Sequence, residues 1–208
     1  CASTPQKVVM TGTVVQPAPD PLVGLEHYDA RTLFHLAADS ARKGDRPRAV
    51  ALYERLLAQF PGDPVENAAR FNLGLLYENA ARWSDAVIQY DALVSVSVPV
   101  EDSDRRTWID AHYRRAVCLG KLERWWEAVA VFEALEAMDW RREDDRLEAL
   151  VGKGIALHEA EDRDGAELSF SQALRYFRVV SKRRRFDERG RAAEAAFRMG
   201  DISRERFG

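Results

Sequence analysis

The chain has 208 residues, of which 46% are hydrophobic and 31% are charged, and its formal net charge is −3. This composition predicts a folded chain with a sizeable core, either one medium domain or a repeat array of the same mass. The small net charge excludes a general attraction to nucleic acid or membranes, and no apolar run approaches the roughly 18 residues of a membrane-spanning helix.

Residues 1–28 form a compositional zone of their own, rich in small and polar residues. Four prolines are spread through it: Pro5, Pro17, Pro19 and Pro21. They favour an extended tether, which at about 3.3 Å per residue would reach roughly 90 Å. The first residue is Cys1 rather than Met, so we expect that a leader was cleaved ahead of it.

From residue 29 onward the pattern is helical, with apolar residues three and four positions apart and no proline after Pro99. One set of residues is separated by 3, 9, 4 and 3 positions: Gly74, Tyr77, Ala86, Tyr90 and Leu93. The same steps recur in three further segments: Ala37, Ser40, Ala49, Tyr53 and Leu56; Ala116, Leu119, Ala128, Phe132 and Leu135; and Gly154, Leu157, Ala166, Phe170 and Ala173. This recurrence predicts four helix pairs.

The spacing has a packing reason. A small residue in the first helix and an Ala in the second allow close approach, and we expect the aromatic residue to fill the space between neighbouring pairs. This order of residues resembles the tetratricopeptide repeat over about residues 30–207. The resemblance implies an all-α solenoid over residues 29–208, preceded by the tether of residues 1–28.

Two departures from the family pattern are expected to alter the repeat. The Ala-to-Ala periods are 37, 42 and 38 residues instead of about 34, so the extra residues should extend loops or second helices, most plainly in residues 95–106. A degenerate fifth unit begins near Phe186, with Ala193 at its small position but Glu205 where the close-packing Ala should stand. We expect a polar cap or an incomplete repeat there.

No catalytic or cofactor signature is recognisable in the sequence. The four histidines lack metal-ligand spacing: His27, His35, His112 and His158. Cys118 lies in an amphipathic helical stretch and is predicted to be a buried, inert thiol. We therefore expect no enzymatic activity, no cofactor, no metal and no small-molecule substrate.

A basic cluster lies in residues 175–191, which carry eight basic and two acidic side chains. The candidate patch is Arg178, Lys182, Arg183, Arg184 and Arg185. Three interpretations remain open: a solvated helix face, a surface for an acidic protein or anionic lipid, and a nucleic-acid site, which is the least favoured.

The family resemblance implies that the first helices form a concave wall on which a partner docks. The residues expected on this wall are Phe34, Ala38, Phe71, Leu75, Glu78, Tyr113, Val117, Val151 and Ile155. Such an apolar wall suits an amphipathic helix or an extended apolar segment, unless the array buries these side chains against itself. Trp108, Trp126 and Trp140 are further candidate contacts, because Trp is enriched at interface hot spots.

Cys1, the tether and the repeat domain together resemble a mature bacterial lipoprotein whose N-terminal Cys carries acyl chains. Ala2 is not the Asp that retains such proteins at the inner membrane, so the resemblance favours the periplasmic face of the outer membrane. The leading hypothesis is a non-enzymatic scaffold that binds other proteins of an envelope machine for motility, secretion or outer-membrane assembly. The alternative is a periplasmic carrier chaperone that holds unfolded chains in its apolar groove.

Overall fold

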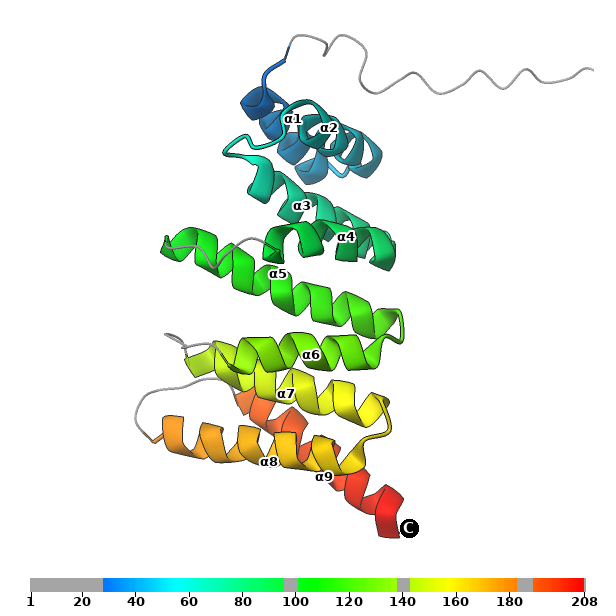
Figure 1. Cartoon of the computed structure of the whole chain (residues 1–208), viewed down its shortest axis with the longest axis vertical. Coiled ribbons are helices and arrows are strands. Elements are labelled where there is room, and N and C mark those ends of the chain that lie inside the picture. Colours follow the sequence, from blue (N-terminus) through cyan, green and yellow to red (C-terminus); the bar gives the residue numbers. More distant parts are fainter. Residues whose placement is uncertain (1–27, 96–100, 138–142, 183–188, 208) are drawn as a thin grey trace, which may run out of the picture.

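A computed structural model describes residues 28–95, 101–137, 143–182 and 189–207 (Figure 1). In these ranges all regular secondary structure is helical. The helices are α1 (Ala30–Arg42), α2 (Arg46–Gln59), α3 (Glu66–Asn79), α4 (Trp83–Val94), α5 (Asp102–Lys121), α6 (Trp125–Glu136), α7 (Glu143–Glu159), α8 (Arg163–Val180) and α9 (Arg189–Phe207). The predicted tether and Cys1 lie outside the described residues.

Consecutive helices form pairs that are stacked in series. The pairs α1–α2, α3–α4, α5–α6 and α7–α8 follow one another along the long axis of the molecule, and α9 packs on α7 and α8 at the end (Figure 1). The first helices α3 and α5 also touch each other. The predicted all-α solenoid of four helix pairs is thereby confirmed. None of the described helices combines the length and the hydropathy that crossing a bilayer would require.

The two helices of each pair are joined by a tight turn with one residue of positive φ. This residue is Gly44 in the first pair (φ 82°), Ala81 in the second (55°), Glu123 in the third (59°) and Glu161 in the fourth (65°). Left-handed backbone suits glycine and is strained for other residues. The turn geometry is thus a property of the repeat, and three of the four turns form without glycine.

Buried alanines bring the helices of each pair together. Ala49, Ala86, Ala128 and Ala166 are at most 1% exposed, as the repeat pattern predicts. The aromatic residue one turn later does not always lie between pairs, however. A Cβ added at Gly74 would stand 2.6 Å from Tyr90 Cε1, and one at Gly154 would stand 2.5 Å from Phe170 Cε1, both within a single pair.

The extra residues of the third and fourth units lengthen helices, and not only second helices. The second helix α8 has 18 residues, but the first helices α5 and α7 have 20 and 17, against 14 in α3. The α5 helix begins at Asp102, within the predicted insertion, whose residues 96–100 lie outside the described ranges.

The fifth unit is a single helix in the described residues. Ala193 and Glu205 both lie in α9, which runs without interruption from Arg189 to Phe207. Within this part of the chain the unit lacks a second helix, as expected of an incomplete repeat, and Glu205 does not occupy a helix-pairing position. Instead, it accepts a hydrogen bond of 3.2 Å from Arg163 Nε and lies 3.5 Å from His158 Nε2.

Candidate partner-binding groove

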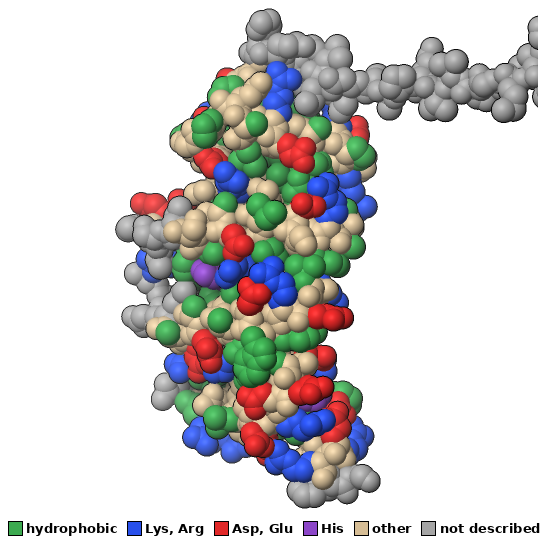
Figure 2. All heavy atoms as spheres, turned by 45° about the vertical axis from the view of Figure 1, so that its right-hand side comes forward, with side chains coloured by type: hydrophobic (Ala, Val, Ile, Leu, Met, Phe, Trp, Pro, Cys, Tyr) green, Lys and Arg blue, Asp and Glu red, His purple; other side chains and the backbone are tan. Residues whose placement is uncertain are grey.

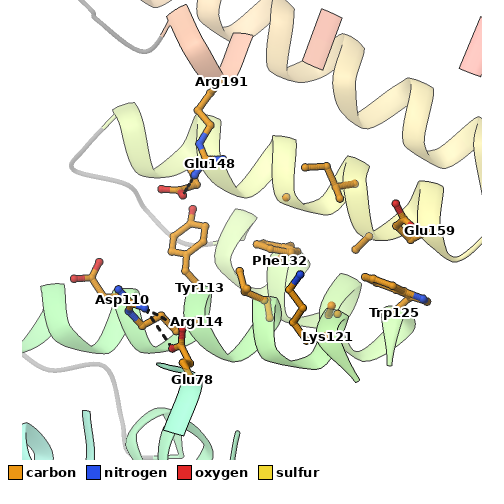
Figure 3. Close-up of a pocket in the computed structure, with 17 residues that line it drawn as sticks. Glu78, Asp110, Tyr113, Arg114, Lys121, Trp125, Phe132, Glu148, Glu159 and Arg191 are labelled. Atoms are coloured by element: carbon orange, nitrogen blue, oxygen red, sulfur yellow. Dashed lines mark hydrogen bonds and ion pairs between the residues drawn. The ribbon is translucent and has the colours of Figure 1, made fainter. Parts of the chain in front are cut away.

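A hollow of about 600 Å³ opens on the side of the stack where first helices meet. In Figure 3, α5 and α7 form its two walls, Phe132 and Trp125 of α6 lie behind them, and Arg191 reaches in from α9. Glu78 of α3 closes the other end. We call this hollow the α5–α7 groove. It spans helices from three consecutive units and the terminal helix.

The base of the groove is apolar, and glycines bring aromatic rings against its walls. A Cβ at Gly120 would lie 2.7 Å from the Trp125 ring, and one at Gly152 would lie 2.5 Å from the Phe132 ring. Both rings therefore lie directly on the backbones of α5 and α7. Beside them, Val117 remains 52% exposed. An exposed valine in a hollow lined by aromatic rings is suited to contact an apolar side chain of a ligand.

Charged residues line the groove, and two of the charge pairs tie neighbouring helices together. Arg114 Nη1 donates to both oxygens of Glu78 at 3.3 and 3.1 Å, which joins α5 to α3. Arg191 of α9 pairs with Glu148 of α7 (Figure 3). Because their charges are already compensated, these residues shape the groove and present little unbalanced charge to a ligand.

Two other charged residues of the groove have no ion pair among the described residues. Asp110 and Lys121 are both exposed; Asp110 lies near the middle of α5 and Lys121 is its last residue, with Val117 between them. At 1.5 Å per residue, eleven positions along the helix separate them by roughly 16 Å. The groove thus offers an acid, an apolar surface and a base in a row.

The tyrosine hydroxyls at the groove act as hydrogen-bond donors. Burial, assisted by the nearby Glu148, raises the pKa of Tyr113, which donates to the Asp145 carbonyl oxygen. Burial and the hydrogen bond to Glu78 raise the pKa of Tyr90. Both hydroxyls remain protonated at neutral pH, so they fasten helices together and are poorly suited to act as nucleophiles.

The structure places the predicted wall residues in four different environments. Tyr113, Val117, Ile155 and Glu78 line the α5–α7 groove. Leu75 and Ala38 line a second hollow of about 400 Å³ nearer the start of the chain. Phe34 and Phe71 are half-buried, and Val151 is only 1% exposed.

Phe34, Phe71 and Val151 share one repeat position, and the packing there explains why Val151 is more buried than the two phenylalanines. Phe34 meets the Tyr53 ring at 5.7 Å between centroids, and Phe71 meets the Tyr90 ring at 6.1 Å. A side chain at this position lies over the aromatic residue of its own pair. The shorter Val151 is buried there. The prediction that Val151 lines the wall is therefore wrong, and it belongs to the core.

The prediction of an unusually apolar wall is also wrong for this groove. It missed Asp110, Arg114, Lys121, Glu148, Glu159 and Arg191, as well as the aromatic Trp125. Helical spacing carried a signal for some of them: Glu148, Gly152, Ile155 and Glu159 are four, three and four residues apart and share one face of α7. Arg191 comes from the terminal helix, and no local pattern places it here.

Only some of the remaining predicted contact residues lie in the described ranges. Arg178 and Lys182 are exposed, but Arg183, Arg184 and Arg185 lie outside the described residues, so the basic patch stays a prediction. Trp126 is 60% exposed, whereas Trp108 is 7% exposed and belongs to the core; Trp140 lies outside the described residues. On the face shown in Figure 2, acidic and basic side chains are intermixed with apolar ones along the stack.

Chemistry-bearing side chains elsewhere in the described ranges do not converge. Among these residues, no group of three or more His, Cys, Asp and Glu side chains could hold a metal ion. Cys118 is fully buried, as predicted, and burial raises the pKa of its thiol to about 12. A thiol with such a pKa is unreactive at neutral pH.

Comparisons with known proteins agree with the architecture. Residues 31–63, which include α1 from its second residue and all of α2, match the tetratricopeptide repeat family. No curated protein sequence matches the chain. The described fold is a tetratricopeptide-type α-solenoid.

Three solved structures illustrate the likeness. The apo form of RapI is 14% identical with a TM-score of 0.66, and the match covers 85% of this chain and 64% of RapI. MamA from Desulfovibrio magneticus RS-1, residues 41 to the end, is 18% identical with a TM-score of 0.54, covering 86% of this chain and 97% of that one. A tetratricopeptide repeat protein from Parabacteroides merdae ATCC 43184 is 18% identical with a TM-score of 0.56, covering 84% and 75%. At these identities the likeness concerns the fold alone.

Proposed function

We propose that this protein is a non-enzymatic scaffold that binds a segment of a partner protein in the α5–α7 groove. The observation that carries the proposal is the exposed Val117 between Asp110 and Lys121, in a hollow backed by Phe132 and Trp125. Stacked helix pairs commonly use such concave surfaces to bind partners. Apolar area here supplies affinity, and the flanking charges set the orientation of the ligand.

The groove specifies a partner of defined chemistry. An apolar side chain over Val117 would be flanked by a basic group near Asp110 and an acidic group near Lys121. A span of roughly 16 Å fits about five extended residues or three turns of helix. A carrier chaperone, the alternative, would need a more uniformly apolar and adaptable surface, so the fixed charge pairs favour a single partner.

The proposed setting is a bacterial envelope complex in which the protein is held at the periplasmic face of the outer membrane through an acylated Cys1. The resemblance of Cys1 and residues 1–28 to a lipoprotein tether supports this setting. The scaffold role and the lipid anchor are separate proposals, and each has its own test.

The scaffold role is tested by photo-crosslinking in cells. We would replace Val117 with a photoreactive phenylalanine analogue and, as the control, Leu168 of α8, which is 61% exposed on a different helix. One discrete protein adduct at position 117, absent at position 168, is expected. Adding Lys121→Glu should weaken that adduct, because it reverses the charge that faces the acidic group of the partner.

Two results would contradict the scaffold proposal. A broad distribution of adducts at position 117, insensitive to Lys121→Glu, would support the carrier alternative. Equal adducts at positions 117 and 168 would mean that the groove has no special role.

A further inference from the structure

The terminal helix α9 exposes one face, and the equivalent face of the first helix is covered in the complete units. Ala193 stands at the small position occupied by Gly74, Ala116 and Gly154 in the first helices of other units, and all three of these are buried. In those units the second helix of the pair lies over this position. In α9, which has no second helix among the described residues, Ala193 is exposed.

The opposite side of α9 is buried against the preceding unit. Ala192, Ala195 and Ile202 are at most 7% exposed, and the helix packs through this side on α7 and α8. The contact with the preceding unit is therefore the ordinary one of the repeat. Among the residues that the structure describes, no second helix makes the remaining contact of the repeat.

The uncovered face carries an aromatic residue as well as small ones. Ala193, Ala196, Phe197 and Gly200 are spaced three, one and three positions apart, which places them on one side of the helix. Phe197 is 64% exposed, the largest value among the large hydrophobic side chains described. A Cβ added at Gly200 would meet no atom within 4 Å, so the backbone there is open.

Elsewhere in this chain, glycines in helices receive aromatic rings. Tyr90 lies on Gly74, Phe132 on Gly152 and Phe170 on Gly154, each so closely that an added Cβ would be under 3.0 Å from the ring. The face of α9 has both halves of this contact, the ring of Phe197 and the open Gly200, and neither is matched within the described chain. A surface that contains both halves is complementary to itself.

We propose that this face of α9, defined as Ala193, Ala196, Phe197 and Gly200, binds the same face of a second copy in an antiparallel, two-fold arrangement. Each Phe197 lies on Gly200 of the other copy. In this register residue 204 of one copy lies opposite residue 193 of the other, which brings Arg204 beside Glu194 at both ends. Both side chains are partly exposed and opposite in charge.

The size of the surface sets the strength of the dimer. One helix face per copy buries less than the roughly 1,200 Å² of a standard interface, so the association is weak. Sedimentation velocity on the full chain, at protein concentrations from about 10 μM to about 500 μM, covers the range in which such a complex forms. A reversible, concentration-dependent dimer is expected.

Three variants test whether the dimer forms through this face. Phe197→Glu should raise the dissociation constant at least about tenfold, because it would bury an uncompensated carboxylate. Leu168→Glu, which changes an equally exposed residue on α8, should leave the constant unchanged. Gly200→Ala should raise the dissociation constant and also raise the thermal stability of the monomer, because Ala favours helix where no neighbour opposes its methyl group.

Several outcomes would overturn the proposal. A chain that stays monomeric over the whole concentration range has no self-association through α9. A dimer unaffected by Phe197→Glu, or weakened equally by Leu168→Glu, forms through another surface. Normal dimerisation of Gly200→Ala would refute the register. Circular dichroism of each variant shows that α-helical structure is retained.

Discussion

One polar side chain in the core is a buried histidine of α5. His112 is 7% exposed, and its ring meets the Trp108 ring at 4.1 Å between centroids. Neither ring nitrogen has a hydrogen-bond partner in the described structure. Burial, together with the positive charge of Arg115, lowers the pKa of His112 to about 4. The folded protein therefore holds this imidazole neutral at neutral pH.

His112 should make stability depend on pH. Between its unfolded pKa of about 6.5 and its folded pKa of about 4, the unfolded chain binds a proton that the folded chain excludes. Stability is fully present above the unfolded value and is lost as pH falls toward 4. Lowering the pH from 7.5 to 5.0 should cost about 2 kcal/mol through this residue.

Urea unfolding at the two pH values measures this effect. In the variant His112→Leu, the loss between pH 7.5 and 5.0 should shrink by about 2 kcal/mol. The control His35→Leu, which changes an exposed histidine of α1, should keep the pH dependence of the original protein. Identical pH dependence in His112→Leu would mean that His112 is protonated as readily in the folded protein as in the unfolded chain.

The terminal helix α9 is attached to the preceding unit by ion pairs as well as by buried apolar contacts. Its buried apolar contacts are small, and ion pairs surround them: Arg206 with Asp164 and Glu167, Glu205 with Arg163, Arg198 with Glu159, and Arg191 with Glu148. The hydrogen bonds from Arg163 and then from His158 lower the pKa of Glu205. The Glu205 contacts are thus present above its unfolded pKa and are lost as pH falls through its lower folded pKa.

The attachment of α9 should therefore weaken with salt or with loss of Arg206. Amide hydrogen exchange followed by mass spectrometry should show faster exchange in α9 at high salt and in Arg206→Glu, by several-fold, because exposed ion pairs are each worth up to about 1 kcal/mol. Arg204→Glu is the matched control, since Arg204 pairs only within α9 in the described structure. Equal exchange in both variants would mean that the apolar contacts alone hold the helix.

Repetition explains which elements could be predicted from the sequence. The steps from Gly74 to Leu93 occur four times, so local packing rules were visible in four copies and located the four helix pairs. Glu205 at the close-packing position indicated that the fifth unit is incomplete, but the helical periodicity of residues 189–207 does not reveal whether the helix breaks before Glu205. The groove was predicted only in part, since Arg191 and Glu148 meet across 43 positions of sequence.

At the scale of the whole molecule, the described helices form an elongated stack, and the predicted tether of residues 1–28 precedes the first helix in the sequence. The helices α5, α6 and α7, which line the groove, lie beyond α4 in the stack, and α9, which carries the proposed self-association face, lies at its far end (Figure 1). An extended tether of up to roughly 90 Å would let the repeat domain reach partners away from a membrane surface. If Cys1 is acylated as proposed, anchoring would also raise the local concentration, which would favour a weak dimer.

The anchor itself is tested by Cys1→Ser in cells that process the full precursor. If acyl chains on Cys1 hold the protein, this variant should move from the membrane fraction to the aqueous fraction. Cys118→Ser is the control for loss of a thiol, since Cys118 is buried in α5 and should not affect fractionation. A Cys1→Ser protein that still sediments with membranes would rule out lipid attachment at this residue.

Serial stacking makes the array elastic. Each helix pair is held mainly by the pairs beside it, so a small rotation at every junction adds up to a large change of curvature along the stack. The α5–α7 groove spans several of these junctions, from Glu78 of α3 to Arg191 of α9. A bound segment would therefore fix the curvature of the second half of the stack. Mechanical tension on the chain would in turn strengthen or weaken the binding of that segment.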